Sequence, residues 1–173
     1  MKPIFTSCEP LFVCVDVDYR LSGAVAAGLW FRGWTASAVE HQAVASFDTV
    51  ADYEPGAFYR RELPCLREVL ARGPQAGVVV VDGYVWVGKG MPGLGAHLHS
   101  VIGGVVVGVA KTRFTPATDA LPICRGTSRT PLYVSAVGMD AGAAAASVAA
   151  MHGPHRIPTL LKLVDSLARS APV

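Results

Sequence analysis

Charged residues, aromatic residues and cysteines are all scarce in this sequence. Only 16% of its 173 residues are Asp, Glu, Lys or Arg, and the formal net charge is +2. So small a charge neither requires nor excludes nucleic acid as a partner, because a local basic patch matters more than the sum. Hydrophobic residues make up 51% of the chain, which excludes a disordered composition. We therefore expect a folded protein with a sizeable core.

The cysteine pattern and the absence of a long apolar run limit the class of protein. The four cysteines, Cys8, Cys14, Cys65 and Cys124, show no CxxC or other metal-binding spacing. Cys14 and Cys65 lie in apolar segments, so we expect both as small core residues. No signal peptide precedes the first expected strand, and no stretch is smooth and long enough to span a bilayer. The sequence favours a cytoplasmic monomer without a membrane partner, folded as one domain over residues 1–173.

The hydrophobic pattern changes type part of the way along the chain. Short turns join three early strand candidates, which predicts an antiparallel meander over residues 11–19, 23–32 and 35–45. Continuous apolar runs, typical of strands covered on both faces, follow at 78–82 and 105–111, with a short strand at 131–135. Helices are predicted over residues 62–72, 96–102, 141–151 and 158–169. This order predicts an α/β fold of the ribonuclease-H-like kind: a mixed sheet, three antiparallel strands then parallel strands, with helices on both faces.

Four acids stand in or beside apolar segments that are far apart in the sequence. Asp16 lies inside an apolar strand, where a carboxylate is costly unless something pairs with it. Asp82 ends another apolar strand, Glu62 opens a helix, and Asp165 interrupts the apolar side of the last helix. A shared divalent cation such as Mg²⁺ is the partner that carboxylate oxygens suit. Together with Lys111 at the end of its strand, the acids indicate metal-dependent phosphoryl transfer.

Each of these residues also has an ordinary structural interpretation. Asp165 can pair with Arg169 one helical turn later, and Glu62 can be a first-turn acid favoured by the helix dipole. A lone Asp at the end of a strand, such as Asp82, is often a turn residue. In the loop after Asp82, Trp86 is a candidate for stacking on a base, with a structural role equally open.

Six segments, in order, resemble the endonuclease V family of deoxyinosine 3′ endonucleases. They are FVCVDVDY, DYEPGAFYRRELPCL, VVVDG, LGAHLHSVIGGVVVGVAKTRF, RGTSRTPLYVSAVGMD and HRIPTLLKLVDSLAR, spread over residues 11–169. The resemblance implies a metal-dependent endonuclease that hydrolyses a phosphodiester bond 3′ to a deaminated, inosine-type base in DNA. It also implies Mg²⁺ as the cofactor, with Mn²⁺ able to substitute.

The resemblance further implies a role for each matching residue. Asp16, Glu62 and Asp82 match the acidic triad of the family, and Asp165 falls where the family has a fourth acid or a His. These four acids would hold the metal and, with Lys111, form the catalytic set. Chemistry on an extruded base also needs a wedge and a close-fitting pocket. Substrate binding is implied for the wedge residues Tyr53, Pro55 and Gly56 and for the pocket residues Gly83, Gly93, Leu94 and His97.

The departures from the family pattern lie near the presumed base pocket. Val85 replaces a glycine and Gly88 replaces a His, so we expect a narrower pocket with one hydrogen-bond partner fewer. We therefore expect inosine strands to be cleaved less than about tenfold faster than undamaged strands. Two alternatives stay open: a diverged nuclease acting on inosine in RNA or on another nucleic-acid structure, and a non-catalytic nucleic-acid or protein-binding module on the same fold. The second leaves the costly buried carboxylates unexplained.

Overall fold

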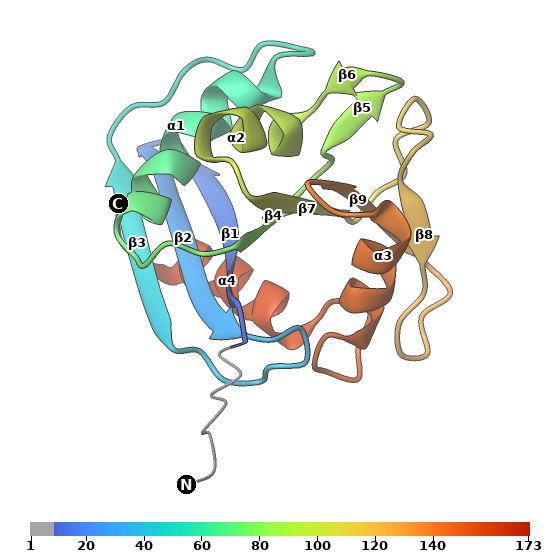
Figure 1. Cartoon of the computed structure of the whole chain (residues 1–173). Coiled ribbons are helices and arrows are strands. Elements are labelled where there is room, and N and C mark those ends of the chain that lie inside the picture. The colour runs from blue at the N-terminus through green and yellow to red at the C-terminus, as the bar shows by residue number, and fades with distance from the viewer. Residues whose placement is uncertain (1–8) are drawn as a thin grey trace, which may run out of the picture.

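Seven strands form the main sheet, in the order β3-β2-β1-β4-β7-β9-β8 (Figure 1). They are β1 (Leu11–Arg20), β2 (Gly23–Arg32), β3 (His41–Phe47), β4 (Val78–Asp82), β7 (Val105–Ala110), β8 (Leu121–Ile123) and β9 (Leu132–Val137). Two short strands, β5 (Trp86–Gly88) and β6 (Met91–Pro92), pair with each other in a separate hairpin. This computed structural model describes residues 9–173, so Cys8 lies outside the described residues.

The pairing of the strands explains how distant acids come together. β1 pairs antiparallel with β2, and β2 with β3, which confirms the predicted meander. β4 then runs parallel to β1, with Val15 opposite Val81, and β7 runs parallel to β4. Asp16 and Asp82, the residues that follow this pair, therefore lie on neighbouring parallel strands. Sites in open α/β sheets form where such strands end.

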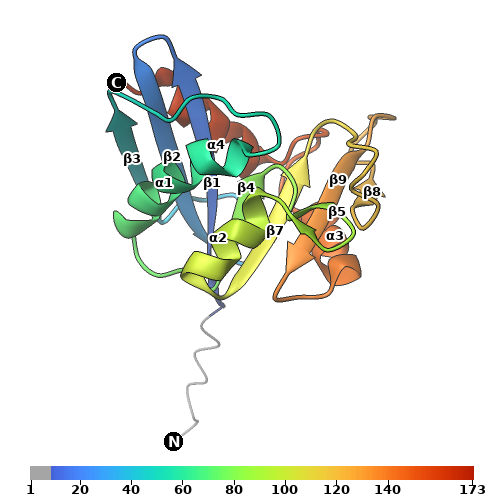
Figure 2. The same ribbon diagram turned by 90° about the horizontal axis from the view of Figure 1, so that it is seen from above.

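Four helices cover the two faces of the sheet, which confirms the ribonuclease-H-like α/β architecture. They are α1 (Phe58–Ala71), α2 (Leu94–Ile102), α3 (Ala141–Ala150) and α4 (Thr159–Ser170). One core cluster joins the sheet to α1 and α2, and another joins it to α3 and α4. Figure 2 shows α1 and α4 on opposite sides of β1 and β2. In β4, Val79 and Val81 pack into the first cluster and Val80 into the second, as expected for a continuous apolar strand.

The last helix is anchored to the first strand. α4 packs against β1 and β2, and it is strongly amphipathic, with Leu160, Val164 and Ala168 buried. The Arg20 guanidinium, at the end of β1, donates hydrogen bonds to the carbonyl oxygens of Ala168 and Arg169 at 2.8 Å each. These carbonyls have no partner within the helix, so Arg20 acts as a cap on the C-terminal turn of α4.

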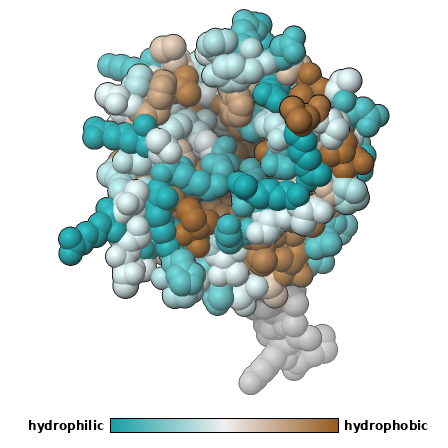
Figure 3. All heavy atoms as spheres, turned by 180° about the vertical axis from the view of Figure 1, so that it is seen from behind, coloured by the Kyte–Doolittle hydropathy of each residue, from teal (hydrophilic) through white to brown (hydrophobic). Residues whose placement is uncertain are grey.

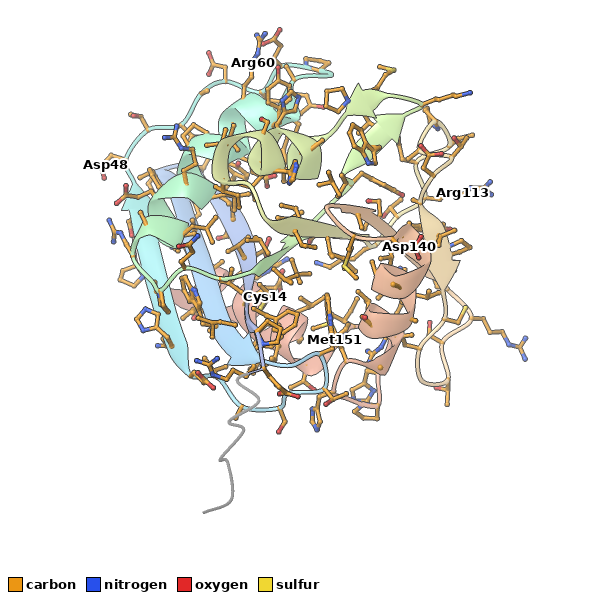
Figure 4. All side chains as sticks on the ribbon, in the orientation of Figure 1. Cys14, Asp48, Arg60, Arg113, Asp140 and Met151 are labelled. Carbon is orange, nitrogen blue, oxygen red and sulfur yellow. The ribbon has the colours of Figure 1, made fainter. Side chains whose placement is uncertain are left out.

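The prediction of core cysteines is confirmed. Cys14 and Cys65 are both buried, whereas Cys124 is exposed. Figure 4 shows Cys14 and Met151 inside the molecule, and both belong to the cluster beneath α3 and α4. The Cys14 Sγ lies 3.6 Å from the carbonyl oxygen of Leu160, and burial raises the pKa of the Cys14 thiol. Such a thiol behaves as a small apolar side chain.

Two element boundaries differ from the predicted ones. α1 begins at Phe58 rather than at residue 62, so Pro64 lies inside the helix instead of in its first turn. The turn bond from the Ala57 N–H to the Glu54 carbonyl, 3.0 Å long, starts the chain turning before the helix. β3 begins at His41 rather than at residue 35, because residues 33–40 form a turn that the Ala36 N–H closes on Gly33 O at 3.2 Å.

The end of the sheet also differs in direction from the expectation. β9 pairs antiparallel with β7, whereas the strand at 131–135 was expected to be parallel. A parallel neighbour needs a crossover connection, usually a helix. The segment between Ala110 and Leu132 contains instead the short strand β8, which pairs antiparallel with β9 and which the sequence analysis did not predict.

The outer surface combines hydrophilic side chains with scattered hydrophobic ones. Figure 3 shows hydrophobic side chains in separate patches between hydrophilic residues on the face seen from behind. Within residues 9–173, no helix combines the length and the apolarity needed to cross a membrane.

Candidate active site

All five residues predicted as catalytic line one cavity of about 380 Å³, which we call the acid cavity. They are Asp16, Glu62, Asp82, Lys111 and Asp165. The cavity lies where β4 and β7 end beside β1. Glu62 reaches it from α1 on one face of the sheet, and Asp165 from α4 on the other face. The fold therefore brings together side chains from the sheet and from both of its faces.

Asp82 and Lys111 form an ion pair at the ends of neighbouring parallel strands. Lys111 Nζ lies 2.7 Å from Asp82 Oδ2, and both side chains are about 40% exposed. Partial burial alone would lower the pKa of Lys111, but the Asp82 hydrogen bond and the charges of Asp82, Asp16 and Asp165 raise it. Lys111 is thus held as a cation that faces three of the four acids.

Asp16 and Glu62 are carboxyl groups in costly surroundings. Burial, and then the nearby charge of Asp82, raise the pKa of Asp16 to about 7. Burial, and then the charges of Asp16 and Asp82, raise the pKa of Glu62 to about 8. The Glu62 Oε2 atom is buried and has no hydrogen-bond partner among the described residues. The positive charges nearby therefore do not offset the cost of ionising Asp16 and Glu62.

Asp165 differs because arginine and lysine side chains surround it. Its Oδ1 atom lies 3.1 Å from Arg169 Nη2, and Lys162 Nζ lies 3.7 Å from Oδ2. Burial would raise the pKa of Asp165, but the Arg169 hydrogen bond and the charges of Lys111, Arg169 and Lys162 lower it overall. The ordinary interpretation, pairing with Arg169, is thus present in the structure. Asp165 nevertheless lines the acid cavity as well.

The donor set suits a hard divalent cation, although the side chains are not arranged around one. Within residues 9–173, no three His, Cys, Asp or Glu side chains converge closely enough to hold a metal ion as they stand. Asp82 is drawn to Lys111 instead. Carboxylate oxygens are nevertheless the ligands that Mg²⁺ and Mn²⁺ prefer, and the unpartnered Glu62 oxygen lies among them. The residues therefore fit such an ion if Asp82 turns away from Lys111.

A second cavity of about 250 Å³ adjoins the acid cavity, and we call it the aromatic cavity. Four predicted substrate-binding residues line it: Gly56, Gly83, Gly93 and Leu94. Its other lining residues include the aromatic side chains Phe58, Tyr59, Tyr84 and Phe114. Phe58, Asp82 and Gly83 line both cavities, so the two are direct neighbours with a shared wall. An apolar compartment thus opens directly beside the acids.

Three other predicted substrate-binding residues lie around this compartment. The His97 ring stacks on Tyr59, with centroids 3.5 Å apart, so His97 supports a wall of the aromatic cavity from behind. Partial burial lowers the pKa of His97. Tyr53 is 63% exposed and meets the edge of the Phe58 ring at 6.4 Å, and Pro55 is exposed next to it. Tyr53 therefore lies at the rim that the two cavities share.

Two residues singled out in the sequence are not where they were expected. Trp86 lines neither cavity; its indole N–H donates to the Ala136 carbonyl at 3.3 Å and ties the β5–β6 hairpin to β9. Val85 is fully buried and packs beneath Gly95 at the start of α2, so its side chain does not narrow the aromatic cavity. The expected narrowing by the Val85 side chain is therefore not seen in this cavity, and the weak preference for inosine stays a prediction.

Two glycines allow the loop after Asp82 to lie close to β7. Gly83 has a φ of +133°, a backbone conformation that residues with a Cβ rarely adopt. A Cβ on Gly108 in β7 would lie 2.5 Å from the Gly83 carbonyl oxygen, which is too close for any substitution without a shift of backbone. Together they bring the aromatic cavity next to the carboxylate of Asp82.

The sequence analysis missed the aromatic residues of the second cavity. Phe58 and Glu62 are four residues apart in α1, a spacing that puts both on one helix face, but the helix was expected to start only at residue 62. Tyr84 holds the far wall: its hydroxyl donates to Thr112 O at 2.7 Å and accepts from the Phe114 N–H at 2.9 Å. No spacing rule in the sequence links Tyr84 to a segment some thirty residues later.

The ribonuclease-H-like sheet, with a cavity of acids at its strand ends, defines the structural class of the chain. A sequence model of the Endonuclease V family matches residues 6–154, and the chain belongs to this family. The resemblance found in the sequence is thereby confirmed. A comparison with curated proteins found no match.

Solved structures agree with this assignment. Endonuclease V from Streptomyces avermitilis is 26% identical, with a TM-score of 0.77, over 94% of this chain and 81% of the other. Human ENDOV is 23% identical, with a TM-score of 0.76, over 94% and 84%. A Ciona intestinalis endonuclease V, solved with a 23mer DNA containing an inosine followed by a ribo-adenosine, is 17% identical, with a TM-score of 0.78, over 92% and 84%.

Proposed function

We propose that this nuclease hydrolyses a phosphodiester bond 3′ to an inosine-type base in DNA, and that it uses Mg²⁺ to do so. The observation that carries the proposal is that the acid cavity and the aromatic cavity lie side by side and share the lining residues Phe58, Asp82 and Gly83. The acid cavity offers carboxylates for a metal ion and a lysine for a phosphate. The aromatic cavity offers ring faces for a base. A nucleotide with its base turned out of the stack needs both.

Asp16, Glu62, Asp82 and Asp165 are the residues that would hold the metal, with Mn²⁺ able to replace Mg²⁺. When bound, such an ion neutralises charge on the phosphate and helps a water molecule to ionise. The raised pKa values of Asp16, about 7, and Glu62, about 8, mean that both carboxyl groups must lose protons to serve as ligands. Metal affinity should therefore increase as the pH rises towards 8.

Lys111 has two successive roles in this proposal. In the structure it neutralises Asp82 at 2.7 Å. Once Asp82 serves the metal, the Lys111 ammonium becomes free to face the phosphate, where it stabilises the charge that develops during hydrolysis. Its raised pKa keeps it protonated for that purpose.

The aromatic cavity would hold the extruded base. Tyr59, backed by His97, offers a ring face for stacking, and Tyr53 and Pro55 at the rim would fill the gap left in the DNA stack. The DNA in the Ciona intestinalis complex, which contains an inosine, supports this class of substrate. That DNA also carries a ribo-adenosine after the inosine, which is why RNA should be tested as a second substrate.

The test uses matched oligonucleotides with one inosine or one adenine, in DNA and in RNA, with Mg²⁺, with Mn²⁺ or with a chelator. We expect metal-dependent cleavage at the second bond 3′ to the inosine, which leaves 3′-hydroxyl and 5′-phosphate ends. Cleavage of RNA alone would favour the alternative substrate. Absence of metal-dependent cleavage of any strand by folded protein would end the proposal.

A crystal soaked with Mn²⁺ gives an independent test of the metal ligands. An anomalous peak among Asp16, Glu62 and Asp82 is the expected result, with Asp82 rotated away from Lys111. A peak elsewhere in the molecule would exclude the acid cavity as the metal site.

A further inference from the structure

A third cavity, of about 460 Å³, lies beside the aromatic cavity, and none of the predicted site residues lines it. It opens between the segment after β7 and the strands β8 and β9. Its lining residues include two aromatic residues, a cation and two hydroxyl-bearing residues: Phe114, Tyr133, Arg113, Thr115 and Thr118. None of its lining residues is an acid. Ring faces, a cation and hydroxyl groups are the side chains that bind single nucleotides of a strand.

The third cavity borders the aromatic cavity at Phe114. Phe114 lines both, it is 46% exposed, and its ring centroid lies 6.1 Å from that of Tyr84. Since Phe58, Asp82 and Gly83 join the aromatic cavity to the acid cavity, the three cavities form a series. The aromatic cavity is in the middle, with the acids on one side and the third cavity on the other.

The walls of the third cavity are held in place by hydrogen bonds. The Tyr84 hydroxyl bonds to the backbone at Thr112 and Phe114, at 2.7 and 2.9 Å. The Arg156 guanidinium donates to the Thr130 carbonyl at 3.0 Å, to the Pro131 carbonyl at 2.9 Å and to the Lys111 carbonyl. The same arginine thus connects the backbone of a predicted catalytic lysine to the start of β9. A site that is fixed before binding loses little entropy when a ligand arrives.

Arg113 supplies a positive charge that is not neutralised within the protein. Among residues 9–173 it has neither an ion-pair partner nor a hydrogen bond from its side chain. Figure 4 shows it extending outward from the segment between β7 and β8. A guanidinium in this setting is ready to pair with a phosphate.

We infer that the third cavity is a subsite for the nucleotide on the 5′ side of the inosine, on the same strand. The inference rests on the proposed function: with the bond 3′ to the base among the acids and the base in the aromatic cavity, the third cavity is the adjoining compartment left for the nucleotide on the 5′ side. The 5′ base stacks on the Tyr133 and Phe114 rings, and its phosphate pairs with Arg113.

The decisive experiment compares two inosine oligonucleotides with identical 3′ sides. One carries five nucleotides on the 5′ side of the inosine, and in the other the inosine is the 5′-terminal nucleotide. We expect wild-type protein to bind the longer strand about tenfold more tightly, by fluorescence anisotropy without metal and by KM with metal. The maximal rate should be similar for both strands. Equal affinity for the two strands would overturn the inference.

Variants then locate the effect. Tyr133→Ala should reduce the affinity ratio of the two strands from about ten to below about two, whereas Tyr133→Phe should keep it, because a phenyl ring still stacks. The ratio is internal to each variant, so a general loss of stability does not change it. If Tyr133→Ala weakens both strands equally, the residue is structural and the subsite is not where we place it.

Arg113→Ala and Arg67→Ala form a matched pair, since Arg67 is an exposed arginine on α1 that lines none of the three cavities. Arg113→Ala should weaken the longer strand several-fold and reduce the salt dependence of its binding, whereas Arg67→Ala should do neither. Equal effects of the two substitutions would mean that Arg113 acts only through net charge.

Two results separate this inference from the proposed function. If no inosine strand is cleaved but the affinity ratio persists and depends on Tyr133, the nuclease proposal fails and the subsite stands as a strand-binding site. A second result would show that the cavity binds the complementary strand and that the inference is wrong. In that case both inosine oligonucleotides are cleaved, but Tyr133→Ala changes binding only when a complementary strand is annealed.

Discussion

The acid cavity and the aromatic cavity share a border but are built in opposite ways. In the acid cavity, polar groups are poorly stabilised. Asp16 and Glu62 have raised pKa values, and one Glu62 oxygen has no hydrogen-bond partner among the described residues. The aromatic cavity has apolar walls and polar groups that are satisfied, such as the doubly hydrogen-bonded Tyr84 hydroxyl. Binding of a cation would therefore stabilise the acid cavity, whereas the polar groups of the aromatic cavity are hydrogen-bonded without any ligand.

The difference also separates chemistry from recognition. Carboxyl groups that are costly to ionise change their charge state or their partner when a ligand arrives, as we propose for Asp82, which would leave Lys111 to bind the metal. Side chains that are already satisfied give a fixed shape and select what fits. We therefore expect changes in the acid cavity to alter rates and pH dependence, and changes in the aromatic cavity to alter affinity.

The largest expected effect comes from Asp82→Ala in the acid cavity. We expect a loss of cleavage rate of at least about 1000-fold, equivalent to ~4 kcal/mol of transition-state stabilisation, because Asp82 is a proposed metal ligand and the partner of Lys111. Single-turnover cleavage of an inosine strand measures it. Asp48→Ala, which removes an exposed acid outside both cavities, should cleave like wild type. Similar rates for the two variants would place the chemistry elsewhere.

The second effect is on stability, and its sign follows from the raised pKa values. In the unfolded chain Glu62 loses its proton near pH 4.5, whereas the folded protein keeps it up to about pH 8. Between these values the folded state binds more protons, so without metal its free energy of unfolding should fall by a few kcal/mol as the pH rises. Glu62→Gln should flatten this dependence in urea titrations at several pH values. A wild-type protein that becomes more stable towards pH 8 would contradict the assignment.

These two predictions concern residues that the sequence made visible. Asp16 lies inside one apolar strand and Asp82 ends another, and a charge in such surroundings is costly, so the local pattern marks both residues. The sequence placed both strands in one sheet, but the structure was needed to show that β1 and β4 are parallel neighbours.

The aromatic cavity was less visible because its walls come from loops and from a helix start. Phe58 and Tyr59 were assigned to a loop, since Pro64 suggested a later first turn for α1. Phe114 meets Tyr84 only through a loop conformation that no periodicity encodes. Trp86 is a residue type that often stacks on bases, yet its indole N–H donates a hydrogen bond to a backbone carbonyl of β9. The direction of β9 was missed because the short strand β8, which precedes it and pairs antiparallel with it, has no clear pattern in the sequence.

A smaller effect is expected from Tyr59→Ala in the aromatic cavity. Removal of the ring that stacks on His97 should raise KM for an inosine strand about tenfold, while the maximal rate changes less than about threefold. Tyr59→Phe keeps the stacking surface and serves as the matched control. A large fall in the maximal rate with unchanged KM would show that recognition and chemistry are not divided between the cavities.

The smallest effects come from removing one hydroxyl group from each cavity. The Tyr19 hydroxyl in the acid cavity is buried without a partner among the described residues, so Tyr19→Phe should stabilise the protein by about 1 kcal/mol. The Arg61 guanidinium, 3.8 Å from the centre of the Tyr19 ring, keeps its contact in that variant.

The opposite sign is expected for Tyr84→Phe, which should destabilise the protein by about 1–2 kcal/mol because it breaks two hydrogen bonds. Urea unfolding of both variants measures the pair at one pH. Shifts of the same sign would mean that the two cavities do not differ in how well their polar groups are satisfied.

The position of Asp165 in the last helix has a consequence for synthesis. Asp16, Glu62 and Asp82 leave the ribosome well before α4, the element that supplies Asp165 and that Arg20 fastens to β1. Until residues 159–170 have emerged and docked, the growing chain carries three of the four acids in a site with one wall missing. The ability to cut nucleic acid should therefore appear late and all at once, after the sheet has been covered on both faces, and not gradually along the nascent chain.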